Sequence, residues 1–121
     1  HALGDQVLQL ITQAVCSELR SADVIGRYGG DEFVILLPQT SAQETLLLTE
    51  RIHESIAAIQ IKTQKGPLSL TISIGIAQTY HAVQPDSVED LFLRADQAMY
   101  IAKRSGRNCA VVFDQDGAGA T

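Results

Sequence analysis

Apolar residues recur at helical spacing in the first part of the chain. Leu8, Ile11, Val15 and Leu19 fall three or four positions apart, which places them on one face of a helix. Asp5 precedes this pattern at the position of a helix N-cap, where a short acidic side chain accepts bonds from exposed backbone N–H groups. We therefore predict an amphipathic helix that begins beside Asp5.

Two short apolar runs come next, and a glycine pair separates them. Residues 24–28 and 32–37 have the composition of strands, and Gly29-Gly30-Asp31 lies between them. Such an arrangement predicts a β-hairpin. The second run contains FVILL, which shows no polar alternation, so we expect helices to cover that strand on both faces.

The second half of the chain contains clear start and stop signals. The sequence SAQE at 41–44 is a capping box that opens a helix, and Ser87 opens another helix that Gly106 ends. Between these helices, residues 68–77 read LSLTISIGIA and alternate strictly, which predicts one half-buried strand. A last short strand is predicted at 109–113.

The predicted order of elements is helix, hairpin, helix, strand, helix, strand. This order indicates an α/β (α+β) fold in which helices flank a mixed sheet. The length of 121 residues fits one domain with a substantial core. We place this domain at residues 1–116. The glycine- and alanine-rich residues 117–121 are expected to form a flexible tail.

The composition narrows the class of protein. Apolar residues make up 45% of the chain and charged residues 19%, as in an ordinary globular domain. No apolar run reaches membrane-spanning length and no signal peptide is visible, so we expect a cytoplasmic domain, either free or part of a membrane-anchored sensor. The net charge of −5 disfavours binding to a nucleic-acid polymer. Cys16 and Cys109 are expected to be reduced core thiols.

The segment RYGGDEF at 27–33 carries the candidate chemistry. Gly29 permits unusual backbone torsions and Gly30 has no side chain to keep a ligand away. Asp31 and Glu32 are neighbouring carboxylates that repel each other unless a cation intervenes, and Mg²⁺ is commonly held by one or two carboxylates together with substrate phosphates. Taken alone, these four residues are more often a structural turn than a metal site, because short motifs match by accident.

Three further segments change this balance. Together with HALGDQVL at the start, ISIGIA at 72–77 and ADQAMYIAKRSGRN at 95–108, the segment RYGGDEF resembles the GGDEF family, the diguanylate cyclases. The resemblance runs along essentially the whole chain and keeps the order of the segments. It implies a nucleotidyl-cyclase-like, palm-like fold with a mostly antiparallel central sheet, and an enzyme that joins two GTP molecules into cyclic di-GMP with release of pyrophosphate.

The resemblance also implies roles for individual residues. Asp31 and Glu32 would hold Mg²⁺ (or Mn²⁺) and help to deprotonate the attacking 3′-hydroxyl, while Gly29 and Gly30 would let the nucleotide lie against the turn. Asp5 would pair with guanine, whose N1–H and amino group suit an acceptor-only carboxylate. A plain helix N-cap remains an equally good interpretation of Asp5, and one side chain could serve in both roles.

Two groups of basic residues complete the expected sites. Lys103 and Arg107 match the pair that binds the triphosphate, and they would share a helix face if the helix continues that far. Arg20 and Asp23 match an Arg-x-x-Asp motif at which the product inhibits many family members, and Arg51 falls where a supporting arginine is often found. The alternatives are a solvated helix end for the first pair and a weak surface ion pair for the second group.

The chain differs from the family's usual pattern at its start, and a second function remains possible. The family's domain normally begins earlier, with a central strand that carries another metal-binding aspartate, so we expect the first strand and helix to be missing and this chain alone to be nearly inactive. Partners implied are GTP, cyclic di-GMP, a second GGDEF domain in a catalytic homodimer, and an attached sensory or regulatory domain. The alternative is a catalytically inactive module that binds cyclic di-GMP or GTP as a receptor or mediates dimerisation.

Overall fold

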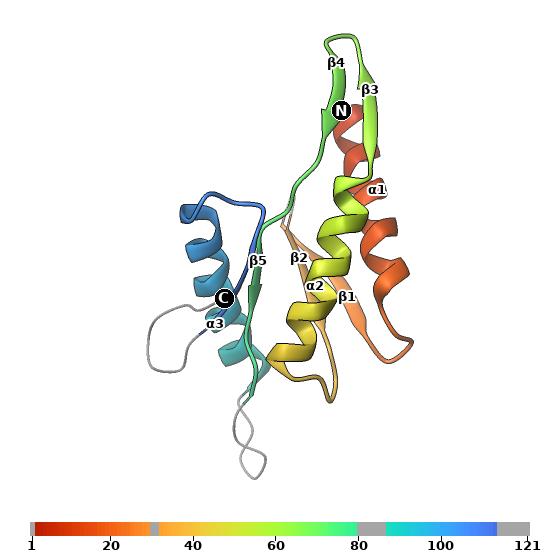
Figure 1. Ribbon diagram of the computed structural model, residues 1–121. Helices are drawn as coiled ribbons and strands as arrows, with labels where there is room; N and C mark the ends of the chain where they lie inside the picture. The colour runs from red at the N-terminus through yellow and green to blue at the C-terminus, as the bar shows by residue number, and fades with distance from the viewer. Residues whose placement is uncertain (1, 30–31, 80–86, 114–121) are drawn as a thin grey trace.

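The computed structural model describes residues 2–29, 32–79 and 87–113. Within these ranges the chain forms nine elements, shown in Figure 1. In chain order they are α1 (Ala2–Glu18), β1 (Val24–Tyr28), β2 (Glu32–Leu36), α2 (Ala42–Ala57), β3 (Gln60–Thr63), β4 (Gly66–Ser69), β5 (Ile74–Ile76), α3 (Val88–Arg104) and β6 (Ala110–Val112). This mixture of helices and strands confirms the predicted α+β class.

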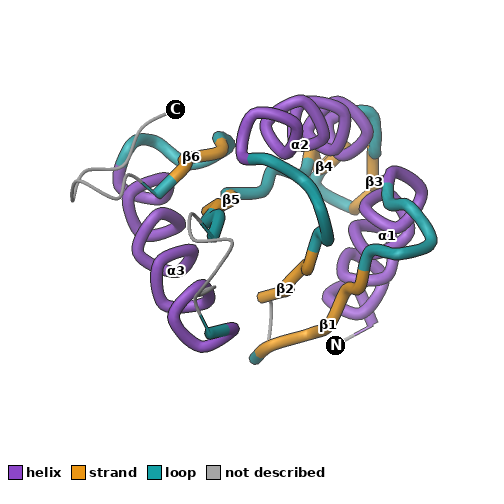
Figure 2. Tube along the Cα trace, turned by 90° about the horizontal axis from the view of Figure 1, so that it is seen from below, coloured by secondary structure: helices purple, strands orange, loops and turns teal. Residues whose placement is uncertain are grey.

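The described strands pair two by two. β1 and β2 form an antiparallel hairpin in which Tyr28 lies opposite Glu32, and β3 and β4 form a second antiparallel hairpin. β5 and β6 run parallel, with Ile74 opposite Ala110. Figure 2 shows α1 and α3 on opposite sides of the molecule, with β2 and β5 between them. Within the described ranges, β2 is hydrogen-bonded to β1 and β5 to β6, and no pairing joins β2 to β5.

The alternating run at 68–77 was predicted as one strand, and this prediction is wrong. Its first part belongs to β4, which pairs with β3, and its later part forms β5, which pairs with β6. The segment between them changes partners while staying against the core, because Leu70 is buried and Ile72 packs on the same apolar cluster. Alternation therefore indicates that one side of the extended chain is buried. It does not show that the whole run pairs with one partner strand. β3 was not predicted.

Three local predictions also need correction. α1 already begins at Ala2, so Asp5 lies in the first helical turn and is not the N-cap. β2 is not fully covered on both faces, because its side chains are only partly buried and Leu36 is exposed. Cys16 is exposed and does not belong to a core. None of the helices in the described ranges combines the length and apolar character that crossing a bilayer requires.

The helix signals in the second half are confirmed. Ser41 accepts a hydrogen bond from the backbone N–H of Glu44, and the Glu44 side chain accepts one from the backbone N–H of Ser41, which is a complete capping box. Ser87 caps α3 by accepting from the N–H of Asp90. Gly106, in the left-handed region, follows the end of that helix.

The described residues have two separate hydrophobic cores. The larger core lies between α1, α2 and their neighbouring strands, and the smaller one lies between α3 and β6. Their buried members are Val15, Leu48, Ile52, Ile56, Ile61 and Leu70 in the first, and Ala98, Ala102 and Val111 in the second. We call the elements around the first core (α1 to β4) the hairpin lobe, and β5, α3 and β6 the C-terminal lobe.

The C-terminal lobe depends on a close approach of α3 to β5. A Cβ atom at Gly75 would overlap the carbonyl oxygen of Ala95 and the backbone nitrogen of Met99. These are backbone atoms of a helix, so they cannot rotate away as a flexible side chain would. Glycine is therefore required at this position for α3 to lie on the strand.

Candidate active site

The hairpin turn begins with a glycine that the backbone requires. Gly29 has a φ of 77°, in the left-handed region that side-chain-bearing residues rarely adopt. Gly30 and Asp31 lie outside the described residues. Glu32 is the first residue of β2, directly opposite Tyr28. The structure thus places the second acid of the motif at the mouth of the hairpin.

Glu32 meets Lys103 from the other end of the sequence. The Glu32 Oε2 and Lys103 Nζ atoms are 3.9 Å apart, and the two side chains are 34% and 38% exposed. An ion pair this open to solvent contributes little stability. The ion pair is informative about position, because it shows that β2 and the last turn of α3 direct opposite charges at one point.

Arg107 lies beyond the helix that carries Lys103. α3 ends at Arg104, and Arg107 and Asn108 have positive φ angles of 64° and 51°. The Arg107 N–H donates to the carbonyl oxygen of Ala102 over 3.0 Å, which holds the turn. The helix does not continue to Arg107, so the condition for Lys103 and Arg107 to share a helix face is not met, although both remain on the same short segment.

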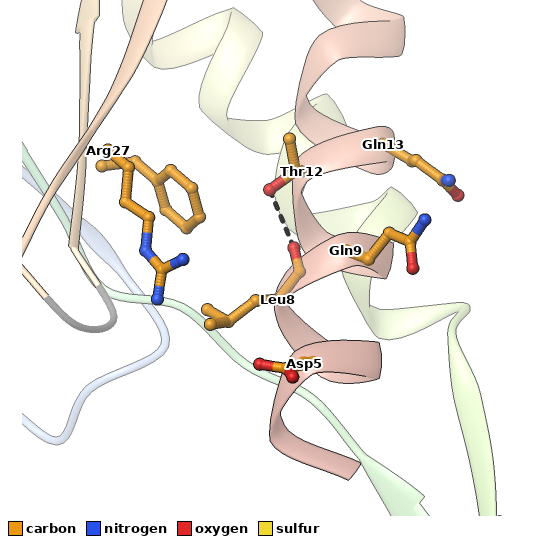
Figure 3. Close-up of a pocket in the computed structure, with 7 residues that line it drawn as sticks. Asp5, Leu8, Gln9, Thr12, Gln13 and Arg27 are labelled. Carbon is orange, nitrogen blue, oxygen red and sulfur yellow. Dashed lines mark hydrogen bonds between the residues drawn. The ribbon is translucent and has the colours of Figure 1, made fainter. Parts of the chain in front are cut away.

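A pocket of about 340 Å³ opens between α1 and the hairpin. Asp5, Leu8, Gln9, Thr12 and Gln13 come from α1, and Arg27 and Phe33 from β1 and β2. Figure 3 shows the Asp5 carboxylate and the Arg27 guanidinium directed into the same space, with the Leu8 side chain between them. The volume lies at the lower end of the range for small-molecule sites.

This pocket contains residues that sequence reasoning missed. Leu8 and Thr12 follow Asp5 by three and seven positions, so they share its helix face, and this spacing was available as a signal. Arg27 and Phe33 are opposite each other in the hairpin register. Their meeting with α1 depends on tertiary packing and had no signal in the sequence.

The Arg-x-x-Asp motif forms a compact turn between α1 and β1. The Asp23 side chain is 2% exposed, and its Oδ2 atom accepts a hydrogen bond of 2.8 Å from the Arg20 backbone N–H. Asp23 Oδ1 lies 3.7 Å from Arg20 Nη2, an ion-pair distance too long for a hydrogen bond, and it has no hydrogen-bond partner among the described residues. Asp23 therefore closes the turn.

The two arginines of the expected inhibitory site have separate contacts. Arg20 Nη2 donates to the Pro38 carbonyl oxygen over 3.3 Å and also to Thr40 Oγ1. Arg51 Nε donates to Glu18 Oε1 over 3.1 Å. Both guanidinium side chains remain more than half exposed, at 61% for Arg20 and 57% for Arg51. The structure brings Arg20 and Asp23 together and holds Arg51 against α1.

Of the two acids expected to hold a metal, Asp31 and Glu32, only Glu32 lies among the described residues. No group of three or more His, Cys, Asp or Glu side chains gathers within the described ranges, and Asp31, the immediate neighbour of Glu32, lies outside them. Glu32 is partly exposed at the mouth of the turn, so its oxygens are accessible to a cation. A hard oxygen ligand in this position fits Mg²⁺.

Comparison with known proteins decides the family. The family described as diguanylate cyclase, GGDEF domain, matches residues 1–109, which include the hairpin, the Asp5 pocket and α3. The chain belongs to the GGDEF domain family. The match covers every segment from which the site above is built.

Individual relatives agree with this GGDEF assignment. Diguanylate cyclase DgcP of Pseudomonas aeruginosa is 45% identical over 109 residues, which are 89% of this chain and 16% of that protein. The crystal structure of diguanylate cyclase SiaD with its activator SiaC, also from Pseudomonas aeruginosa, superposes with a TM-score of 0.82 at 38% identity, over 93% of this chain and 42% of that one.

A third relative was solved with a ligand. The GGDEF domain of DgcB from Caulobacter crescentus, in complex with c-di-GMP, superposes with a TM-score of 0.79 at 25% identity, over 93% of this chain and 66% of that chain. The present chain thus spans 16%, 42% and 66% of these three relatives, so it matches only part of each.

Proposed function

We propose that this GGDEF domain condenses two GTP molecules into cyclic di-GMP and releases two pyrophosphates. The observation that carries the proposal is the meeting of Glu32 and Lys103 at 3.9 Å, because an acid suited to a metal lies beside an ammonium group suited to phosphate. Family membership indicates the class of reaction, and the pocket beside the hairpin has room for a guanine base.

Asp5 is the proposed contact for the guanine base. Its carboxylate faces the pocket from the first turn of α1 and accepts hydrogen bonds only, as the N1–H and amino donors of guanine require. Leu8 and Phe33 line the same pocket and offer apolar surface to a planar ring. This combination of apolar walls and one directed acceptor is typical of small-molecule sites.

Glu32 and Asp31 are the proposed metal ligands, and Lys103 and Arg107 the proposed phosphate ligands. The metal, when bound, neutralises charge on the reacting phosphate and lowers the pKa of an oxygen nucleophile bound to it. Lys103 then exchanges its weak contact with Glu32 for charge-assisted hydrogen bonds to phosphate oxygens. Gly29 and Gly30 allow the nucleotide to lie close to the turn.

Two domains are needed for the complete reaction. Each domain holds one GTP, and the 3′-hydroxyl of each attacks the α-phosphate of the other. Each new P–O bond replaces the bond to pyrophosphate, and the hydroxyl protons pass to the acid pair or to water. We expect the 121 residues alone to turn over slowly, because within the described ranges no strand pairing holds β2 and β5 together.

Product inhibition at Arg20, Asp23 and Arg51 is part of the proposal. The exposed guanidinium groups of Arg20 and Arg51 suit the phosphates and guanine edges of cyclic di-GMP. The buried carboxylate of Asp23 orients the turn that presents Arg20. Arg20→Ala therefore weakens cyclic di-GMP binding, whereas its effect on the GTP site is small.

Product formation from GTP tests the proposal. The chain is incubated at high concentration with GTP and Mg²⁺ for several hours, and cyclic di-GMP is quantified by mass spectrometry. We expect product from the wild-type chain, none from Glu32→Gln, and a wild-type amount from Glu54→Gln, a matched exposed acid on α2. Equal product from both variants contradicts the role of Glu32. Binding of GTP or cyclic di-GMP without any product, even in a longer chain to which the family's first strand and helix are restored, identifies the inactive receptor or dimerisation module instead.

A further inference from the structure

The candidate GTP site draws its residues from both lobes. Asp5 and Glu32 belong to the hairpin lobe, and Lys103 belongs to the C-terminal lobe. α3 packs chiefly on β5 and β6, while α1 packs on α2, so each lobe has its own core. A ligand that reaches from Asp5 to Lys103 therefore binds well only when the two lobes are held in one alignment.

A hydrogen bond fixes the lobes on the side of α2. The Ala42 backbone N–H donates to Gln78 Oε1 over 2.9 Å, and α2 also packs on β5 and β6. The Glu32–Lys103 pair, which is the phosphate end of the candidate GTP site, lies on another side, between the hairpin and α3. A contact that aligns the lobes near the site therefore has to join the hairpin to α3.

The Tyr28 and Phe92 rings join the hairpin to α3. Their centroids are 4.8 Å apart, with an interplanar angle of 57°, a tilted arrangement that aromatic pairs favour. Tyr28 directly precedes Gly29 and lies opposite Glu32 in the register. The ring contact is thus made by the strand residue closest to the functional turn.

These rings do not fill a core. Tyr28 is 55% exposed, and neither ring belongs to either of the two apolar clusters. Tyr28 stays more than half exposed despite the contact, so overall stability explains its presence poorly. Its location between the lobes and beside the Glu32–Lys103 pair points to a role in alignment.

We propose that Tyr28 and Phe92 are positioning residues for GTP, which hold the hairpin against α3 so that Glu32 and Lys103 reach the same triphosphate. This inference rests on the proposed function of the site. It assigns a task to two aromatic residues that touch neither the base nor the phosphates. An aromatic contact of this kind changes an equilibrium constant by about two- to tenfold.

Three ligands separate alignment from general stability. Guanosine occupies the Asp5 pocket of the hairpin lobe, pyrophosphate occupies the basic end of the C-terminal lobe, and GTP with Mg²⁺ spans both. For Tyr28→Leu and Phe92→Leu, calorimetric titration should show about two- to tenfold weaker GTP binding, with guanosine and pyrophosphate unchanged. Tyr28→Phe and Phe92→Tyr keep the rings and should bind GTP as the wild type does.

Tyr100→Leu is the matched control. Tyr100 is an exposed aromatic residue on α3 whose hydroxyl accepts from Arg104, so its loss removes a ring without touching the hairpin. We expect this variant to bind all three ligands normally. Equal weakening of all three ligands by Tyr28→Leu would show a general loss of structure and would overturn the proposal.

A distance measurement tests the alignment without any ligand. Spin labels are placed at the exposed positions Val24 on β1 and Leu93 on α3, with Cys16 and Cys109 replaced. Phe92→Leu should broaden the distance distribution, and Tyr100→Leu should not; an unchanged distribution in Phe92→Leu overturns the inference. If the wild type binds no GTP, the proposed function fails, and the distances still decide whether the rings align the lobes.

Discussion

Glu32 and Lys103 lie close enough to attract each other and open enough to exchange partners. Each side chain is about one third exposed, and the 3.9 Å separation is long for a charge-assisted hydrogen bond. A bound metal or phosphate therefore competes with a weak contact and not with a buried ion pair. Glu32 and Lys103 are thus held near the positions proposed for metal and phosphate binding, and breaking their mutual contact takes little free energy from ligand binding.

Replacement of Lys103 tests this arrangement at the residue scale. Lys103→Met keeps the length of the side chain and removes the charge, so we expect GTP affinity to fall by about tenfold or more, the value of one hydrogen bond to a charged group. Arg104→Met is the control, because Arg104 donates to the Tyr100 hydroxyl over 3.0 Å and stacks on its ring. Calorimetric titration with GTP and Mg²⁺ measures both, and an equal loss in the two variants would refute a specific role for Lys103.

Gly75 provides a second test at the residue scale. Gly75→Ala drives a methyl group into the backbone of α3 at Ala95 and Met99, so the free energy of unfolding should fall by about 1–3 kcal/mol or more. Gly26→Ala is the matched control in β1, where no atom lies within 4 Å of the added Cβ. Denaturant titration followed by circular dichroism compares the two. Similar stabilities would contradict the close approach of α3 to β5.

The capping box makes the stability of the N-terminus of α2 depend on pH. The Ser41 backbone N–H, with help from the Ser41 hydroxyl, holds the pKa of the Glu44 carboxyl below its usual range. A carboxyl whose pKa is lower in the folded chain stabilises that chain above the unfolded pKa, and the contribution disappears as the pH falls through the lowered value. The helix start should therefore be fully capped at neutral pH.

Acid titration tests the capping box. We expect the Ser41 amide signal in an NMR titration to shift as the pH falls through and below the ordinary range of glutamate, when protonation weakens the acceptor. Glu44→Gln keeps an acceptor oxygen without a titrating proton, so its Ser41 amide should stay constant over the same range. A Ser41 shift that persists in Glu44→Gln would show that another group is responsible.

Local signals predicted elements well where one short motif determines the structure. The capping box at Ser41, the hairpin around Gly29 and the cap at Ser87 all depend on neighbours within a few residues. Prediction failed where the outcome depends on distant partners. Alternation at 68–77 could not show that the segment leaves β3 for β6.

The candidate site shows the same division. The residue types at Asp5, Glu32 and Lys103 were predictable from short segments that resemble the family. The ion pair between Glu32 and Lys103 and the ring contact between Tyr28 and Phe92 join distant segments, and they follow from tertiary packing alone. The structure of Gly30 and Asp31 lies outside the described residues, so the role of Asp31 stays a prediction.

At the scale of the whole molecule, the chain provides half of the reaction that we propose. One Asp5 pocket and one Glu32–Lys103 pair serve one GTP, and the described part of the chain contains no second copy of either. Two chains must meet before a 3′-hydroxyl faces an α-phosphate. The rate of product formation should therefore depend on how often two loaded chains encounter each other.

Concentration dependence tests this requirement. While most chains are monomers, doubling the chain concentration at saturating GTP should raise the initial rate of cyclic di-GMP formation about fourfold, by mass action. The rate per chain is measured from well below to well above the concentration at which light scattering detects dimers. A rate per chain that does not change over this range would show that one chain suffices.

The most direct test of the central claim is a crystal structure of the chain with a non-hydrolysable GTP analogue and Mg²⁺. We expect the guanine base on Asp5 in the pocket between α1 and the hairpin, the metal on Glu32, and the phosphates on Lys103. A nucleotide bound elsewhere, with Glu32 and Lys103 still facing each other and no metal beside them, would contradict it.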